Sequence, residues 1–294
     1  MSLPATLILG FIAGATILLG LPVGRLRKPA PSLRLVLNAA AVGVLLFLVW
    51  DVLSAAWEPI DSALGSIGQG EGGFGKALGY GAIFAGGLIV GLGALVVYER
   101  WMHKQVAARP AGTPRIQGLG AMTLGEVKPP RGIATWSAAR RLALLIAVGI
   151  GLHNFAEGLA IGQSAASGAI SLALMLVIGF GLHNATEGFG IVAPLAADVD
   201  DDGEPRRPSW GLLLVLGAIG GGPTFLGTVL GYSFTSEPLS VAFLTLAAGS
   251  LLYVITQLIG VAARAKRADL LATGILLGLL AGFLTDGIVT AAGV

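Results

Sequence analysis

The sequence has 294 residues, of which 55% are hydrophobic and only 12% are charged, and its mean hydropathy is +0.85. A soluble domain carries about twice that fraction of charged residues, so the composition excludes an ordinary water-soluble protein. The net charge of +2 is too small to favour nucleic acid as a partner, and the absence of cysteine excludes disulfides and thiolate metal ligands.

The apolar residues gather in eight stretches, each close to the roughly 20 residues that a helix needs to cross a bilayer. We therefore expect an all-α polytopic membrane protein with a single transmembrane domain over residues 1–294. In chain order, the expected helices are 3–22, 33–56, 77–100, 140–163, 168–194, 210–232, 239–262 and 269–292. Glycines are frequent inside these stretches, where small residues let helix backbones approach closely.

Basic residues are concentrated in alternate connections between the expected helices. The connections after the first, third, fifth and seventh helices carry them, whereas Lys76 is the only basic residue in the connections on the other side. Because basic loops remain in the cytoplasm, this asymmetry predicts that both termini are extracytoplasmic. We expect a multi-pass protein of the plasma membrane.

Two connections on the basic side are long. Residues 101–139 contain four prolines and predict a flexible cytoplasmic loop without a core of its own. The other connection begins with an acidic run, 198–204, which has two readings: a solvated loop, or a weak cation-collecting mouth at the exit of a transport path.

The strongest motif is a repeat shared by the fourth and fifth expected helices. Residues 149–161 (GIGLHNFAEGLAI) and 179–191 (GFGLHNATEGFGI) are identical at eight of thirteen positions. Within each copy, His at position i and Glu at i+4 project from one face of a helix. If the two helices are antiparallel and turn near residues 164–167, both motifs lie at the same depth, in the middle of the membrane.

The repeat predicts a metal site between the fourth and fifth helices. Its candidate ligands are His153, Asn154, Glu157, His183, Asn184 and Glu187. Imidazole and carboxylate together suit zinc, and also ferrous iron, manganese, cobalt or cadmium, whereas the absence of sulfur argues against copper(I). Carboxylates at this depth are costly unless a cation compensates them. A packing role for the His-Asn pairs and a metal-free proton relay through the same His and Glu residues are the alternatives.

The motifs HNFAEG (153–158) and HNATEG (183–188), in consecutive helices, resemble those of the ZIP (Zrt/Irt-like) family of metal importers. The helix count, the topology and the long loop after the third helix are similar as well. The resemblance implies that metal moves toward the cytoplasm through a principal site of His153, Glu157, His183 and Glu187. It also implies that Asn154 and Asn184 face an adjacent second site that shares the glutamates.

The sequence departs from this family in two places. Ala156 and Thr186 stand where the family often has proline before the motif Glu, so a kink there is not assured, although Pro194 can bend the fifth helix lower down. The sixth helix reads GGGPT at 220–224 and contains no carboxylate. We therefore expect one dominant metal position. The glycine run with Pro223 predicts a break in this helix that serves as a gate or as a close-packing point.

Two aspartates inside other expected helices are candidates for an entrance path. Asp51 in the second helix and Asp286 in the eighth both fall toward the outer leaflet by the predicted topology. Asp51 lies close to the expected helix end, so capping or interfacial exposure is an equal alternative for it. The following outer loop is expected to be acidic, with Glu58, Asp61 and Glu71.

Together these features predict a transporter that carries a divalent metal, with zinc first among the candidates, into the cytoplasm. The metal is then the substrate, no organic cofactor is expected, the protein is not an enzyme, and the glycine-rich helix faces favour a homodimer. Two other functions stay open: an intramembrane zinc-dependent hydrolase, and a proton-coupled carrier of an organic solute.

Overall fold

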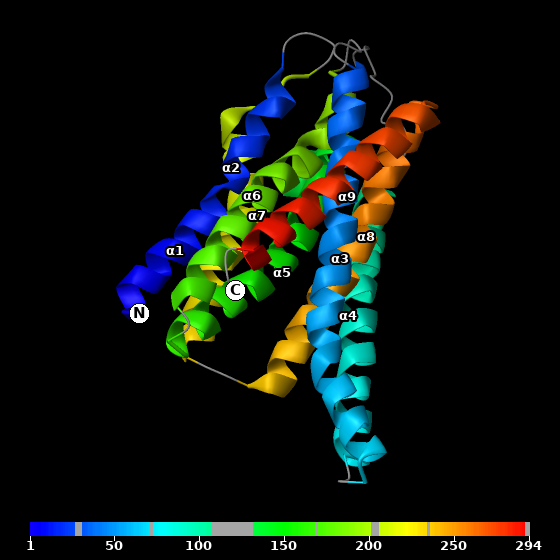
Figure 1. Ribbon diagram of the computed structural model, residues 1–294. Coiled ribbons are helices and arrows are strands. Elements are labelled where there is room, and N and C mark those ends of the chain that lie inside the picture. The colour runs from blue at the N-terminus through cyan, green and yellow to red at the C-terminus, as the bar shows by residue number, and fades with distance from the viewer. Residues whose placement is uncertain are drawn as a thin grey trace, which may run out of the picture.

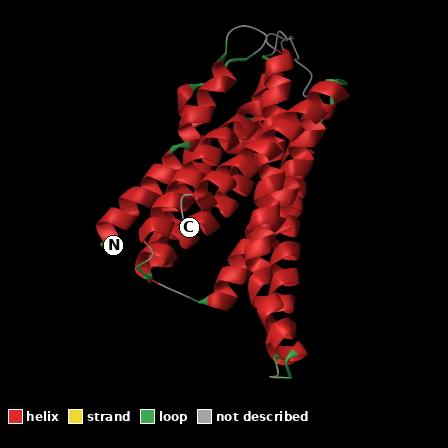
Figure 2. Cartoon of the chain, viewed as in Figure 1, coloured by secondary structure: helices red, strands yellow, loops and turns green. Residues whose placement is uncertain are grey.

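Within the residues that it describes, the computed structural model contains eight helical segments that are long and apolar enough to cross a membrane, which confirms the expected number of spans. Figure 2 shows that this part of the chain is helical apart from short connections. The structure describes residues 1–26, 31–70, 73–107, 132–168, 170–200, 206–233 and 236–291. Its elements are α1 (Leu3–Ala15), α2 (Ile17–Gly20), η1 (Leu21–Arg25), α3 (Pro31–Gly68), α4 (Phe74–Ala107), η2 (Gly132–Thr135), α5 (Ala138–Ala166), α6 (Ile170–Val192), η3 (Ala193–Ala197), α7 (Trp210–Ser233), α8 (Glu237–Ala263) and α9 (Ala268–Ala291).

The first span is an interrupted helix that consists of α1, α2 and the 3-10 turn η1. The interruption falls at Thr16, whose hydroxyl donates a hydrogen bond of 2.6 Å to the carbonyl oxygen of Ala13. Hydroxyls that bond back to the preceding turn in this way often bend helices. The fifth span changes in a similar manner, because α6 ends at Val192 and the chain tightens into η3 around Pro194.

The second span is much longer than the sequence predicts. It was expected to end at residue 56, but α3 continues through Pro59 to Gly68, and its 38 residues extend roughly 57 Å, well beyond a hydrocarbon core of about 30 Å. The expected acidic outer loop is therefore wrong for Glu58 and Asp61, which belong to α3, while Glu71 lies outside the described residues. Hydropathy falls where a helix leaves the lipid, and a helix can continue in water.

The sixth span is continuous, so the predicted break at Pro223 is wrong. α7 runs without interruption from Trp210 to Ser233. Proline removes only one backbone donor from the helix, and Gly220 and Gly221 pack against neighbouring helices, as the close-packing alternative predicts. A Cβ atom on Gly221 would lie only 2.1 Å from the carbonyl oxygen of Gly14 in α1.

α5 lies at the centre of the bundle and is the most buried of the eight spans, whereas α4 and α9 are the most exposed (Figure 1). α5 packs most extensively on α7 and also contacts α6 and α8. α1 packs on α6 and α7, and α3 packs on α8 and α9, with α4 against α8. The two repeated motifs are thus placed on helices that neighbouring spans cover on several sides.

At one end of the bundle α4 and α8 end and α5 and α9 begin, and Arg140, Arg141, Arg264 and Arg267 lie there (Figure 1). We call this the basic end. The predicted flexible loop is partly helical at its margins, because α4 continues to Ala107 and α5 begins at Ala138. Residues 108–131 of this loop, and residues 201–205 of the acidic run, lie outside the described residues.

An ion pair joins the two motif-bearing helices at the basic end. Arg140 Nε in the first turn of α5 donates to Asp198 Oδ2, just after η3, over 2.8 Å. The side chain of Asp198 is only 1% exposed and that of Arg140 is 23% exposed. The reading of the acidic run as a solvated loop is therefore wrong for its first residue.

We expect Arg140→Gln to lower the free energy of unfolding by about 3 kcal/mol, because removing one partner leaves the buried Asp198 carboxylate without its counter-charge. Thermal unfolding of the purified protein in detergent measures this loss. Arg267→Gln is the matched control, since the Arg267–Asp269 pair at the same end is exposed and should matter little. Adding Asp198→Asn to Arg140→Gln should restore part of the stability. Equal melting of both single variants would contradict the expectation.

Candidate metal centre

The structure brings three of the four strongest candidate ligands together. His153 and Glu157 of α5 and His183 of α6 each offer one ligand atom, and these atoms all lie within 4.8 Å of one another. His153 Nε2 lies 2.9 Å from Glu157 Oε1, and His183 Nε2 is hydrogen-bonded to the same oxygen. We call these three residues the His-Glu-His cluster. Its members meet because i and i+4 share a helix face and because α5 packs against α6.

The cluster is almost entirely shielded from solvent. His153 is 1% exposed and Glu157 is 4% exposed, whereas the His183 side chain retains 12%. His153 Nδ1 and Glu157 Oε2 are buried and make no hydrogen bond. The ring centroids of Phe180 and His183 lie 5.4 Å apart, so the phenyl ring covers the imidazole on one side. Buried polar atoms nearly always have partners, so these unpartnered atoms indicate a site built for a ligand.

Glu187, the fourth strong candidate, does not belong to the cluster of mutually close ligand atoms. It is nevertheless 1% exposed, and Asn154 of the same repeat is the side chain that hydrogen-bonds to its carboxylate. It interacts electrostatically with His153 and Glu157. A charged carboxylate that is buried inside a membrane protein is costly unless a cation lies near it. The structure therefore places Glu187 beside the cluster, next to Asn154.

The two asparagines of the repeat fix their helices to neighbouring backbones. Asn154 Nδ2 donates to the carbonyl oxygen of Gly220 in α7 over 3.0 Å, and Asn184 Nδ2 donates to that of Ala13 in α1 over 3.1 Å. Their Oδ1 atoms are buried and accept no hydrogen bond. The nitrogen of each amide thus serves helix packing, which was the alternative role predicted for the His-Asn pairs. The oxygens remain available as neutral ligands.

Sequence reasoning did not assign a role to the glycine that ends each motif. A Cβ atom on Gly158 would lie 2.0 Å from the carbonyl oxygen of Thr224 in α7, and one on Gly188 would lie 2.4 Å from that of Ile17 in α2. Both contacts are with backbone, so no side chain can move aside, and only glycine allows this approach. The repetition of glycine in HNFAEG and HNATEG was the signal that could have revealed it.

Thr224 is a second residue that the sequence did not single out. It lies in α7, where the sequence showed no carboxylate, and its Oγ1 is buried without a hydrogen-bond partner. Its backbone oxygen accepts from the hydroxyl of Thr228 over 2.8 Å. The Thr224 side chain faces Gly14 of α1, and only its backbone faces Gly158 of α5, so α7 brings no negative charge to the cluster.

Asp51 and Asp286 lie on α3 and α9, which pack against each other. Both are partly exposed, and Asp51 interacts electrostatically with Asp286 and then with His183 and His153. Capping is not the role of Asp51, because α3 continues to Gly68 and places this residue in the middle of the helix. Asp51 and Asp286 are therefore neighbours, and Asp51 lies near enough to both histidines of the cluster to interact with them.

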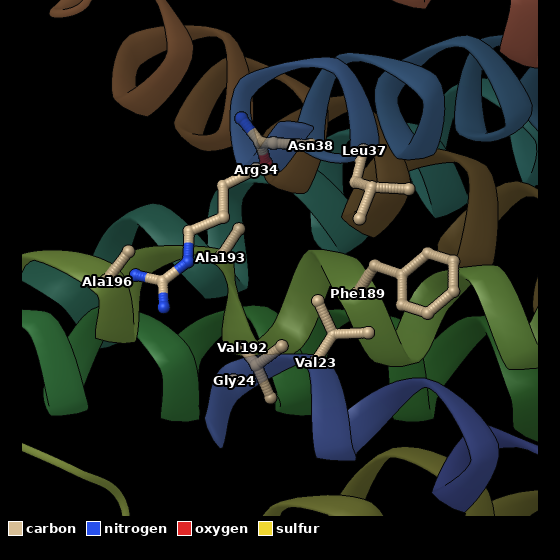
Figure 3. Close-up of a pocket in the computed structure, with 9 residues that line it drawn as sticks. All are labelled: Val23, Gly24, Arg34, Leu37, Asn38, Phe189, Val192, Ala193 and Ala196. Atoms are coloured by element: carbon tan, nitrogen blue, oxygen red, sulfur yellow. The ribbon is translucent and has the colours of Figure 1, made fainter. Parts of the chain in front are cut away.

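A small cavity lies between the basic end of α3 and the end of α6 (Figure 3). Its volume is about 30 Å³, enough to hold a water molecule. Arg34 and Asn38 line it from α3, and Val192 and Ala196 line it from the opposite side. Asn38 Nδ2 donates to the carbonyl oxygen of Leu258 over 3.1 Å, but its Oδ1 is buried and accepts no hydrogen bond. This cavity provides a polar position on the basic side of α6.

Comparison of the sequence with protein-family models and with curated proteins gives no match to either. The class of the protein therefore rests on its fold and its site. It is a multi-pass helical membrane protein with a buried His-Glu-His cluster between two antiparallel spans.

Proposed function

We propose that this protein carries a divalent first-row transition metal, zinc foremost, across the membrane toward the cytoplasm. The His-Glu-His cluster is the observation that carries the proposal. Two imidazole nitrogens and a carboxylate oxygen within 4.8 Å of one another form a ligand set that suits such metals. The cluster is buried in the interior of a membrane protein, where ionisable groups are functional by default. The resemblance of both motifs to those of the ZIP family supports the same function.

One dominant metal position fits the arrangement best. The cluster contains a single carboxylate, Glu157, and Glu187 supplies a second negative charge beside it. Two carboxylates balance one dication. The remaining candidates, Asn154 and Asn184, offer only neutral oxygens, so a second dication would lack counter-charge in a medium where uncompensated charge is expensive.

The path that we propose begins at Asp51 and Asp286, passes the His-Glu-His cluster and leaves toward the basic end. The electrostatic interaction of Asp51 with His183 supports the first step. The cavity beside Asn38 supports the last, because it lies on the basic side of α6 and contains a free carbonyl-type oxygen. The excess of Lys and Arg at the basic end favours a cytoplasmic location for it in the plasma membrane, with both termini outside.

A homodimer belongs to the proposal as well. α4 is the least buried span, and Cβ positions on Gly79, Gly86 and Gly93 meet nothing within 4 Å in the described residues. Small residues spaced seven apart leave one face of a helix open to close approach by another. Native mass spectrometry in a mild detergent reports the number of protomers, and a purely monomeric protein would remove this part of the proposal.

Uptake of a panel of divalent metals into proteoliposomes tests the function. The purified protein is reconstituted around a metal-sensitive dye, and zinc, iron, manganese, cobalt and cadmium are added in turn outside. We expect protein-dependent uptake of at least one of them, zinc first, with none in protein-free liposomes. Elemental analysis of the same preparation should find about one transition metal per chain, as two compensating carboxylates predict.

The alternatives give different results in the same assay. A proton-coupled carrier of an organic solute would contain no transition metal after purification, and its flux would be indifferent to chelators. A zinc-dependent hydrolase would contain metal but move none. The proposal fails if no metal of the panel enters the liposomes above the protein-free background.

A further inference from the structure

A second polar cavity, separate from the metal site, lies among the end of α4, the start of α5 and the end of α8. Its volume is about 170 Å³. Its polar lining residues are Glu99, Arg141, Gln257 and Arg264, and the rest of the lining is mostly apolar. Its deepest residue on α5, Leu145, precedes His153 by about 12 Å along the helix axis. We call it the basic cavity.

Aromatic residues place the basic cavity at the level of the lipid headgroups. Tyr98 and Trp101 of α4 stack with ring centroids 5.9 Å apart, and Trp101 is largely exposed. Trp136 lies just before α5, and its carbonyl oxygen accepts a hydrogen bond from Arg141 Nη1. Trp and Tyr gather where the hydrocarbon meets water and headgroups, so the cavity opens at this interface.

The charge of the cavity favours an anion. Neither Arg141 nor Arg264 forms an ion pair with a carboxylate in the described part of the chain. Glu99 is the only acidic residue of the lining, and it already accepts a hydrogen bond from the Tyr253 hydroxyl and has a further interaction. Two guanidinium groups against one engaged carboxylate leave a positive cavity. Guanidinium recognises phosphate through parallel, charge-assisted hydrogen bonds.

We propose that the basic cavity binds the phosphate of an anionic phospholipid headgroup. Basic pockets between membrane helices on the cytoplasmic side are suited to such headgroups. A lipid is favoured over free phosphate because the cavity lies at headgroup depth and because Met102 and Leu142 give it apolar walls against which the glycerol and first acyl carbons can pack. The bound headgroup bridges α5, which carries half of the metal site, to α4 and α8.

Native mass spectrometry of the full chain tests this binding. The protein in mild detergent is titrated with phosphatidylglycerol and, separately, with phosphatidylcholine, and we expect preferential retention of phosphatidylglycerol. The double variant Arg141→Gln/Arg264→Gln should bind it roughly 30-fold more weakly, because each arginine near the membrane surface contributes about fivefold. Arg264→Gln alone should lose about fivefold, and because Arg264 is exposed beyond the end of α8 it does not disturb packing.

The control is Arg267→Gln, which removes the same charge at the same end but outside the cavity, from an exposed pair with Asp269. It should bind phosphatidylglycerol like the wild type. Equal retention by the wild type and both cavity variants would overturn the proposal, as would an equal loss in Arg267→Gln, which would indicate only general attraction of charge. In a last titration, inorganic phosphate is added to the protein with bound phosphatidylglycerol. Saturable binding of free phosphate that displaces the lipid would overturn the assignment of the cavity to a lipid.

Discussion

Replacing Glu157 with glutamine should abolish metal uptake and remove the bound metal from the purified protein. Glu157 Oε1 is the atom on which both imidazoles converge, 2.9 Å from His153 Nε2 and hydrogen-bonded to His183 Nε2. Glutamine keeps the size of the side chain and removes its charge, so the two imidazoles would face a dication without the carboxylate between them. Loss of a group that merely orients a ligand costs about 10–100-fold in affinity, and loss of a ligand should cost about a hundredfold or more.

The matched control for this variant is Glu58→Gln. Glu58 lies on the exposed surface of α3 and loses the same charge in the same substitution, but seven residues, about 10 Å along the axis, beyond Asp51. Uptake by Glu58→Gln should equal that of the wild type. Size-exclusion elution and melting temperature show whether Glu157→Gln is folded, and glutamine fills the same volume at this buried position. A folded Glu157→Gln protein with undiminished uptake of every metal in the panel would exclude the His-Glu-His cluster as the transport site.

The sequence predicts the spans well because hydropathy measures contact with lipid, but it does not locate helix ends in water. The eight apolar stretches all form helices. The end of the second span was wrong by twelve residues, because Glu58, Pro59 and Asp61 lower the hydropathy without ending α3. The predicted break at the glycine run before Pro223 was wrong because it, too, rested on composition. Composition does not distinguish a glycine that loosens a helix from one that lies against a neighbouring backbone, as Gly221 does against Gly14.

For the candidate site, residue spacing along the sequence predicts some contacts, and helix packing determines the others. The i, i+4 spacing places His153 and Glu157 on one face, and the repeat brings His183 to the same depth. Which glutamate lies between the imidazoles depends on how α5 and α6 are rotated about their axes, and no spacing contains that angle. The same rotation decides that the asparagine amides bond to the backbones of α7 and α1.

Alanine at Gly158 should separate α5 from α7 and thereby impair transport without touching a ligand. The added Cβ atom would lie 2.0 Å from the carbonyl oxygen of Thr224 and 2.8 Å from its carbonyl carbon. Both are backbone atoms, so the helices themselves must move apart. Overpacking of this kind costs about 1–3 kcal/mol and occasionally more. Because Gly158 directly follows Glu157, the displacement also shifts the carboxylate, so both the melting temperature and metal uptake should fall.

Gly222→Ala in α7 is the control, because a Cβ atom there meets nothing within 4 Å in the described residues. Alanine is favoured over glycine in a helix by about 1 kcal/mol, so this variant should melt at or above the wild-type temperature and keep full uptake. The opposite signs of the two changes make the comparison decisive. If Gly158→Ala melted and transported like Gly222→Ala, α5 and α7 could not be packed backbone to backbone. The glycine of the repeated motif would then be needed neither for helix packing nor for transport.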